Sequence, residues 1–250
     1  RGSGSAPVAS PELYKKALRF MKKCMNDSPV LYPVFAKHGT SRGIDGHGGV
    51  RGIFPGKNFT ATGEFIPVDK LGVEARKSRK IGQENCARCP VRCGQLNIAR
   101  TGRYAGTLTE GPEYETVYSF GGQTGVDNLD SVIVADRLAD EYGIDSMSAG
   151  VAIGFAMELY EKGILTKEET EGVALNFGND EAMLDLIRLM SLRQGLGDLL
   201  ADGVRIAAEK IKQGSEKYAM HVKGLELPGY DVRGAKAHGL NYATSFTGAD

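Results

Sequence analysis

The sequence lacks several features that mark large classes of protein. Its 250 residues carry 31 basic and 31 acidic side chains, so the formal net charge is zero. Nucleic acids and anionic membranes attract proteins with excess positive charge, and the balance here argues against both as partners. No apolar run approaches the ~20 residues that span a bilayer, and no charged-then-apolar secretion signal opens the chain. We therefore expect a cytoplasmic protein with no nucleic-acid or membrane partner.

Cysteine is also scarce. There are four cysteines in all, and three of them lie together in Cys86-Ala-Arg-Cys89-Pro-Val-Arg-Cys93. A secreted disulfide scaffold usually has an even, dispersed set of cysteines, which this sequence does not have. The chain begins RGSGSAPVA, without an initiator Met, and stops directly after Thr247-Gly248-Ala249-Asp250. We therefore expect it to be part of a longer polypeptide.

What the sequence does contain is mostly helical periodicity. Apolar residues recur every three or four positions in several segments that we expect to be helices: 11–27, 127–142, 146–162, a segment opened by a capping box at Thr166 and Glu169, 180–193, and 200–211. Residues 28–62 break every period and predict a long irregular stretch. Only residues 218–227 have the pattern of a strand, and no alternating βαβ pattern is present. These patterns predict a mainly α, multihelical fold with helices packed on helices and little strand.

The cysteine triplet predicts a metal site. Thiolates spaced two and three residues apart on a turn can all face one point, as an iron–sulfur cluster or a zinc ion requires. We favour a [4Fe–4S] cluster because zinc sites usually add a second CxxC pair or histidines at matching spacing, and none of the four histidines lies near the triplet. Cys24 is the remaining candidate for a fourth ligand. It falls on the apolar stripe of helix 11–27, which favours a packed thiol instead.

Six segments in order carry a family resemblance. They are CARCPVRC (86–93), GPEYET (111–116), DEYGIDSMSAG (140–150), GDLLADG (197–203), KGLELPGYDVRGAKAHGLNYATS (223–245) and the closing TGAD. Together they resemble the tungsten-dependent aldehyde:ferredoxin oxidoreductase family over about residues 1–250. The resemblance implies a tungsten or molybdenum bis-pyranopterin, a [4Fe–4S] cluster beside one pterin, a small aldehyde as substrate and ferredoxin as electron acceptor.

The resemblance also implies a domain plan. It assigns residues 1–209 to a helical middle domain and residues 210–250 to the start of a C-terminal domain. This sequence does not match the family's N-terminal pterin-binding domain, nor the distal segment whose DxxGLC motif supplies the fourth cluster cysteine. We therefore expect this stretch alone to be inactive, and the family plan leaves a homo-oligomer open.

Site residues follow from the resemblance position by position. Cys86, Cys89 and Cys93 match three cluster ligands, while Cys24 does not match the fourth. Asp140, Gly143, Ile144 and Asp145 match the pterin-contacting DxxGLD motif with Ile in place of Leu; read without the family, the same residues are a helix–helix turn with Asp145 as N-cap. The remaining matches lie beside the metal in the family: Tyr114, Glu115 (with Glu113 as alternative) and His238.

These matches suggest roles. A carboxylate such as Glu115 can act as base if burial raises its pKa, and an imidazole such as His238 can donate a hydrogen bond to substrate. By itself the segment around Glu115 has the pattern of a loop. His38, His47 and His221 have no such match.

Two readings from other classes remain open. The chain could be an electron-transfer or scaffold subunit that carries a cluster without its own chemistry, or a helical interaction domain stabilised by zinc. Absorption near 400 nm distinguishes a cluster from zinc, and tungsten content distinguishes an oxidoreductase from a carrier.

Overall fold

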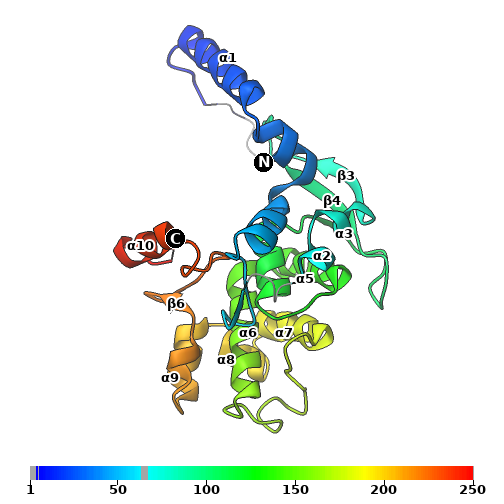
Figure 1. Cartoon of the computed structure of the whole chain (residues 1–250), viewed down its shortest axis with the longest axis vertical. Helices are drawn as coiled ribbons and strands as arrows, with labels where there is room; N and C mark the ends of the chain where they lie inside the picture. The colour runs from blue at the N-terminus through cyan, green and yellow to red at the C-terminus, as the bar shows by residue number, and fades with distance from the viewer. Residues whose placement is uncertain (1–3, 5, 63–66, 250) are drawn as a thin grey trace.

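The computed structural model describes residue 4 and residues 6–62 and 67–249. The expected mainly α fold is confirmed: helices dominate, and the described strands form small antiparallel sheets of two or three strands (Figure 1). Arg1 and the final residue of the closing TGAD motif, Asp250, lie outside the described residues. None of the helices in the described ranges is long and apolar enough to cross a membrane.

Three helices predicted from periodicity form the centre of the fold. They are α5 (Leu129–Tyr142), α6 (Ser146–Glu161) and α7 (Asp180–Leu192), each within two residues of the expected bounds. Each begins at a side chain that accepts a hydrogen bond from a backbone amide of the first turn, namely Asn128, Asp145 and Asn179. These caps satisfy amides that have no partner within the helix, so the start of each helix is fixed locally.

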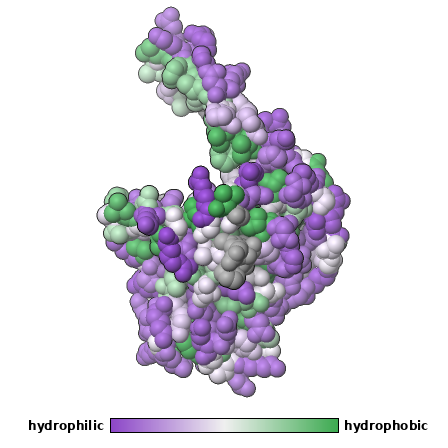
Figure 2. Space-filling view, viewed as in Figure 1, coloured by the Kyte–Doolittle hydropathy of each residue, from purple (hydrophilic) through white to green (hydrophobic). Residues whose placement is uncertain are grey.

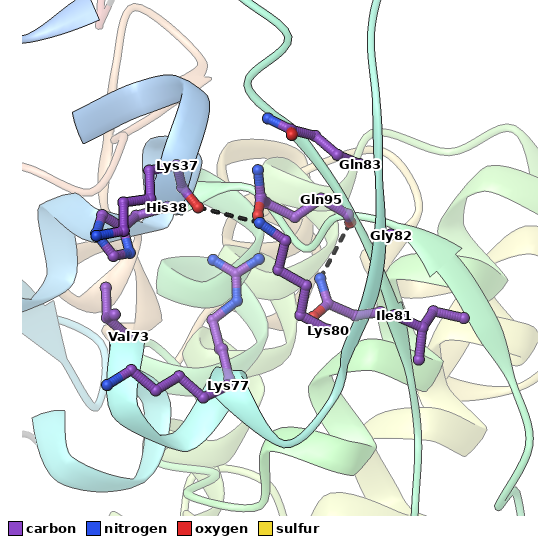
Figure 3. A pocket seen from close by; sticks show the side chains of 11 residues that line it. Lys37, His38, Val73, Lys77, Lys80, Ile81, Gly82, Gln83 and Gln95 are labelled. Atoms are coloured by element: carbon purple, nitrogen blue, oxygen red, sulfur yellow. Dashed lines mark hydrogen bonds between the residues drawn. The ribbon is translucent and has the colours of Figure 1, made fainter. Parts of the chain in front are cut away.

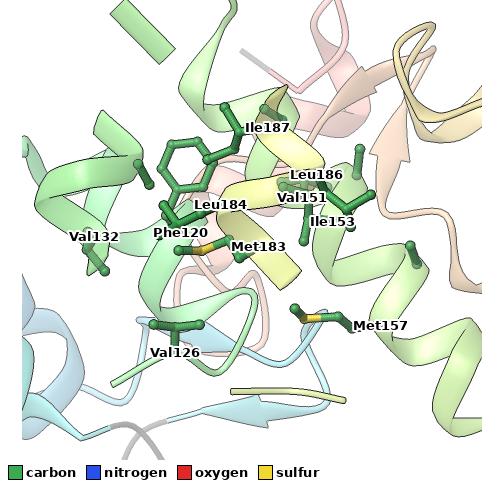
Figure 4. Packing of buried hydrophobic residues seen from close by; sticks show 14 of the residues in the cluster. Phe120, Val126, Val132, Val151, Ile153, Met157, Met183, Leu184, Leu186 and Ile187 are labelled. Carbon is green, nitrogen blue, oxygen red and sulfur yellow. The ribbon is translucent and has the colours of Figure 1, made fainter. Parts of the chain in front are cut away.

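Helix α6 is buried along most of its length and organises the core (Figure 4). Val151, Phe155 and Leu159 from the predicted apolar stripe are fully buried. On another face, a Cβ at Gly150 would lie 2.5 Å from the backbone of Ser119, so only glycine permits this approach. Helix α6 therefore packs directly against the irregular helix η5 (Tyr118–Gly122), which continues α4 (Tyr114–Val117). The segment around Glu115, expected to be a loop, is thus a helix anchored on the core.

The N-terminal helix α1 (Pro11–Asp27) has the predicted bounds but projects from the body of the molecule (Figure 1). None of its residues is buried, and its apolar residues are visible on the surface (Figure 2). The expectation that Cys24 is a packed thiol is wrong, because Cys24 is exposed. The helix is amphipathic as predicted, but no described residue covers its apolar face.

Residues 28–62 are irregular, as expected, but they are not without structure. They contain the short helical turns η1 (Leu31–Ala36), η2 (Thr40–Arg42) and η3 (Ile44–Val50), followed by the paired strands β1 (Pro55–Gly56) and β2 (Ala61–Thr62). Ile44 and Phe54 from this stretch are fully buried. Two short helices, α2 (Val68–Leu71) and α3 (Val73–Lys77), follow.

A three-stranded antiparallel sheet is present that the sequence did not predict. It consists of β3 (Lys80–Glu84), β4 (Gly94–Ile98) and β5 (Leu108–Glu110), with β4 in the centre. Glu84 pairs with Gly94, so the cysteine triplet lies in the loop that joins β3 to β4. These strands are short and contain glycine and polar residues. The sequence therefore lacks the alternation of apolar and polar residues that would predict a strand.

The C-terminal third departs from expectation in three places. Thr166 and Glu169 form both bonds of the capping box, at 2.8 and 3.4 Å, but the segment makes turns and no helix. The helix expected over 200–211 is two helices, α8 (Leu196–Leu200) and α9 (Val204–Ile211), separated at Gly203, whose φ is 85°. The expected strand 218–227 is a hairpin of β6 (His221–Val222) and β7 (Leu225–Glu226), preceded by η6 (Ser215–Tyr218). Helix α10 (Lys236–Thr244) is the last helix among the described residues.

Candidate functional site

Helix α4 and the segment before α10 meet through two hydrogen bonds at Gly229. The Tyr114 hydroxyl donates to the carbonyl oxygen of Gly229 at 2.6 Å, and the amide of Gly229 donates to Glu115 Oε2 at 2.8 Å. A Cβ at Gly229 would lie 2.8 Å from the ring of Tyr118, so this approach requires glycine. The backbone at Gly229 therefore fixes the two side chains that match the family's metal-proximal pair.

The Glu115 carboxyl lies among tyrosines. Its pKa is raised to about 7, chiefly by burial. The hydrogen bond from Gly229 lowers the pKa, and the charge of Asp145 raises it further. After burial, Glu115 is in turn the first charge that raises the pKa values of Tyr114, Tyr230 and Tyr242. A carboxyl with a pKa near 7 can both take up and release a proton at neutral pH.

His238 lies at the opposite edge of the same cluster. On α10 it stacks on Tyr230, with ring centroids 4.4 Å apart and planes 11° apart, and it lies 6.0 Å from the ring of Tyr242. The structure thus gathers Glu115 and His238 around the same two tyrosines. The hydroxyl of Tyr242 is buried and has no hydrogen-bond partner among the described residues, which leaves it available to a group bound there.

His47, which has no match in the family reading, also belongs to this cluster. Its ring lies 5.4 Å from that of Tyr114, edge to face, and 5.5 Å from that of Tyr230. Burial, followed by the charges of Arg51 and His238, lowers its pKa, so it is neutral at pH 7. We call His47, Tyr114, Glu115, Tyr230, His238 and Tyr242 the aromatic site. Its open side is a cavity of ≈ 540 Å³ lined by His47, Tyr114, Tyr230 and residues of η1, η2 and η3.

Glu113, the alternative to Glu115, faces a different neighbourhood. Its carboxylate accepts a hydrogen bond from the Thr40 hydroxyl, and its charge contributes to raising the pKa values of Asp136, Glu110 and Cys93. It therefore lies on the side of α4 that faces the cysteine loop. Of the two carboxyls, Glu115 is the one within the aromatic site.

The segment 140–145 joins α5 to α6. Gly143 adopts the left-handed conformation that ends α5, with φ 67°, and Asp145 Oδ2 accepts the Ser148 amide at 2.7 Å. Asp145 is exposed, and its charge raises the pKa of Glu115. A hydrogen bond of 3.3 Å between the Thr116 and Ser146 hydroxyls links α4 to α6. Asp140 is exposed and Ile144 partly buried. The helix–helix turn and the N-cap are thus both present, and the turn lies beside the aromatic site.

The cysteine triplet lies in a loop that begins with a hydrogen-bonded turn. The amide of Cys89 donates to the carbonyl of Cys86 at 2.9 Å, forming a turn, and Arg88 and Arg92 have positive φ angles of 63° and 57° immediately before the second and third cysteines. All three are free thiols, Cys86 exposed and the others partly buried. Burial and then the charge of Glu113 raise the pKa of Cys93.

The three thiols can be compared with what a metal cluster requires. Within residues 4, 6–62 and 67–249, no three His, Cys, Asp or Glu side chains stand close enough to hold one metal ion together. Three soft thiol ligands on one loop nevertheless have the chemistry that a [4Fe–4S] cluster requires of three of its irons. The three side chains are therefore of the type that such a cluster requires, but their sulfur atoms would have to move closer together to bind it.

Comparison with known proteins identifies the family. A family model described as "Aldehyde ferredoxin oxidoreductase, domains 2 & 3" matches residues 16–250. The chain belongs to the aldehyde ferredoxin oxidoreductase family. Its curated relatives include the tungsten-containing aldehyde ferredoxin oxidoreductase of Thermococcus kodakarensis, 36% identical over 249 residues, and an aliphatic sulfonate oxidoreductase, WOR-like subunit, of Pyrococcus furiosus, 32% identical over 260 residues. These alignments cover 99% and 100% of this chain but 40% of each relative, so the chain spans about two fifths of their length.

A solved structure shares the fold. The active site complex BamBC of benzoyl coenzyme A reductase, in complex with 1,5-dienoyl-CoA, aligns with a TM-score of 0.71 and 26% sequence identity. The alignment covers 92% of this chain and 36% of that chain. The two relatives are named oxidoreductases and the solved structure is named a reductase, so membership of the family assigns an oxidoreductase without fixing its substrate.

Proposed function

We propose that the protein containing this chain is a tungstopterin iron–sulfur oxidoreductase that oxidises small aldehydes to carboxylic acids and passes the electrons to ferredoxin. In that reaction an aldehyde and water give a carboxylic acid, two protons and two electrons. Tungsten, or molybdenum, bound by two pyranopterins would accept the electrons, and a [4Fe–4S] cluster would relay them. The observation that carries the proposal is the Glu115 carboxyl, whose pKa is about 7, in a family of tungsten-containing relatives.

In this proposal each of three residues of the aromatic site has a separate role. Glu115 takes a proton from water or the aldehyde hydrate and releases it to solvent between turnovers. His238 donates a hydrogen bond that orients the substrate oxygen. Tyr114 is committed to the Gly229 carbonyl, so it keeps α4 in register and Glu115 in place.

The cofactors would be held by residues around this site. Asp140, Gly143, Ile144 and Asp145 would contact a pterin at the α5–α6 turn, where the exposed Asp145 carboxylate can accept from pterin N–H groups. Cys86, Cys89 and Cys93 would provide three cluster ligands. A fourth would come from sequence that follows the motifs seen here, and residues 1–209 and 210–250 would be the middle domain and the start of the C-terminal domain.

The test is Glu115→Gln in the full-length protein. The amide keeps the shape of the side chain and removes the base, so kcat should fall ~10²–10⁴-fold while tungsten content and the cluster spectrum stay unchanged. Glu161→Gln, on the exposed end of α6, is the matched control and should leave kcat unaltered.

Other outcomes of the same experiment are informative. Full activity of Glu115→Gln at full tungsten occupancy would remove Glu115 as the base and make Glu113 the next candidate. Loss of tungsten together with activity would show that Glu115 has a structural role. A wild-type protein that carries iron and no tungsten would instead support a cluster-carrying electron-transfer subunit, and one that carries zinc alone would support a zinc-stabilised domain.

A further inference from the structure

A second cavity lies between Lys37 and His38 and residues of α3, β3 and β4 (Figure 3). It shares no lining residue with the cavity of the aromatic site. Its volume is ≈ 590 Å³, within the range of small-molecule sites. Five of its lining residues are basic: Lys37, His38, Arg76, Lys77 and Lys80. We call it the basic cavity.

Arg76 is the most unusual group in the basic cavity. Only 6% of this residue is exposed, and its Nε and Nη1 atoms are buried without a hydrogen-bond partner in the described chain. Burial lowers its pKa to about 10, so the guanidinium is charged at neutral pH. Leaving a buried charged donor unpaired is costly, and such a group in a lined cavity indicates a missing ligand.

Nearby carboxylates do not pair with Arg76. Glu113, Asp136 and Asp45 are close enough for their charges to raise its pKa, but each is engaged elsewhere. Glu113 accepts from Thr40, Asp136 accepts the Thr109 hydroxyl at 2.5 Å, and Asp45 accepts the Val73 amide at 3.1 Å.

The other cations in the basic cavity add to the same imbalance. Lys80 donates to the carbonyl of Lys37 at 3.0 Å, and its pKa is lowered by burial and then by Arg76. The pKa of His38 is lowered by burial and then by Lys37, Arg42 and Lys80. Like charges therefore repel across this cavity, and an anion between them would relieve the repulsion.

The floor of the basic cavity offers one acceptor as well. Asn97 donates its side-chain amide to the carbonyls of Gln95 and Gly111, at 3.0 and 2.5 Å, while its Oδ1 is buried and unpartnered among the described residues. A ligand that fits both Arg76 and Asn97 must carry oxygens that accept from a planar guanidinium and a group that donates a hydrogen bond to Asn97. A singly protonated phosphate group has both, whereas a simple carboxylate has only the first.

We propose that the basic cavity binds the phosphate group of a small phosphate monoester, with Arg76 as the bidentate donor, Lys80 as a second cation and Asn97 as acceptor of the phosphate hydroxyl. The site is separate from the aromatic site, and the proposal does not depend on the reaction catalysed there. The aliphatic stems of the lysines with Val73 and Ile81 would contact the organic part of the ligand.

The test measures binding of inorganic phosphate to the full-length protein and to the 250-residue chain, by calorimetry and by the shift in melting temperature. Phosphate should raise the melting temperature of the wild type, and acetate at the same ionic strength should not. Arg76→Met should weaken phosphate binding at least tenfold. Without phosphate, the same variant should resist urea better than the wild type, because it removes an unpaired buried charge.

Controls separate the site from general electrostatics. Arg188→Met, on the exposed face of α7, removes the same charge and should leave phosphate affinity unchanged. Arg76→Lys keeps the charge without the planar fork and should weaken binding severalfold, which keeps the test decisive if the Met variant does not fold.

Three results would overturn the proposal. The first is an absence of phosphate binding by the wild type, and the second is equal loss in Arg188→Met and Arg76→Met. The third is binding by the 250-residue chain but not by the full-length protein, which would show that the remainder of the polypeptide fills the cavity.

Discussion

The aromatic site and the cysteine loop differ in the contacts that hold them in place. In the aromatic site, bonds join residues far apart in sequence: Glu115 meets the Gly229 amide, and Tyr114 meets the Gly229 carbonyl. In the cysteine loop the fixed contacts are local, between Cys86 and Cys89 and across the paired ends at Glu84 and Gly94. Core packing therefore fixes the aromatic site before any ligand binds. The cysteine loop supplies three sulfur atoms, and a bound metal would have to bring them together.

The difference has an energetic side. Acid–base groups must be held in a defined environment, because the pKa that would suit Glu115 to the proposed role is produced by burial. Thiolates bind metal strongly enough to organise a short loop themselves. A site that depends on burial therefore requires core packing, whereas a site that depends on ligation needs only a closed loop.

The largest expected effect is on stability at the aromatic site. Phe54 is fully buried and lies edge to face with Tyr114 and Tyr118, at 5.7 and 6.2 Å. Phe54→Ala should lower the free energy of unfolding by about 3–5 kcal/mol, measured by urea denaturation. Ile81→Ala, at an exposed position on β3, is the control and should cost less than ~0.5 kcal/mol. Equal losses in the two variants would contradict the comparison.

A smaller effect is expected from pH. Burial raises the pKa of Asp136 from 3.8 to about 7, so the folded protein binds this proton more tightly than the unfolded chain. The stabilisation is complete below pH 3.8 and is lost as pH rises through 7. Asp136→Asn should remove most of that fall in stability, seen as a flatter plot of unfolding free energy against pH. An unchanged slope would show that Asp136 is not the group responsible.

The smallest effect is expected at the cysteine loop. Replacing Cys86, Cys89 and Cys93 together by Ser should change the unfolding free energy of the metal-free chain by less than ~0.5 kcal/mol, because these side chains are exposed or only partly buried. The same variant should lose all iron after anaerobic reconstitution of the full-length protein. Cys24→Ser is the matched control and should keep it. Loss of iron in the control would mean that Cys24 is a ligand after all.

Thiol reactivity sharpens the same comparison. In the folded metal-free chain a thiol reagent should modify Cys24 and Cys86 first, since both are exposed. Cys93 should react last, because its raised pKa lowers the thiolate fraction. Uniform rates for all four would contradict the structure of the loop.

The sequence predicted the central helices well and the sheet poorly. Helices α5, α6 and α7 follow from apolar periodicity together with the caps Asn128, Asp145 and Asn179, which are local signals. The β3–β4–β5 sheet has no such signal, because Gly82, Gln83 and Gly94 interrupt any apolar alternation. The turns after Thr166 show that a formed capping box does not by itself propagate a helix.

The candidate site divides in the same way. Residues in ordered motifs, such as Glu115, Asp145 and His238, could be named from the resemblance, and the structure places them around one cluster. His47 could not be named, because it lies in the irregular stretch where spacing carries no information and only tertiary contact with Tyr114 and Tyr230 identifies it. Arg76, in α3, could not be named either, because the burial of a charged side chain is a property of the fold.

The short range of the β3–β4 pairing has a consequence for how the protein is made. Chains are synthesised at ~5–20 residues per second, so roughly 6–30 s separate the emergence of the cysteine hairpin from that of Gly229. Hairpins close in microseconds, and the three thiols are therefore presented to the cell long before the aromatic site exists. Ribosome-bound chains that stop before Gly229 should already show the thiol labelling order of the finished loop. A metal carrier or an oxidant would thus meet the nascent chain first, and the order of loading would be set by translation.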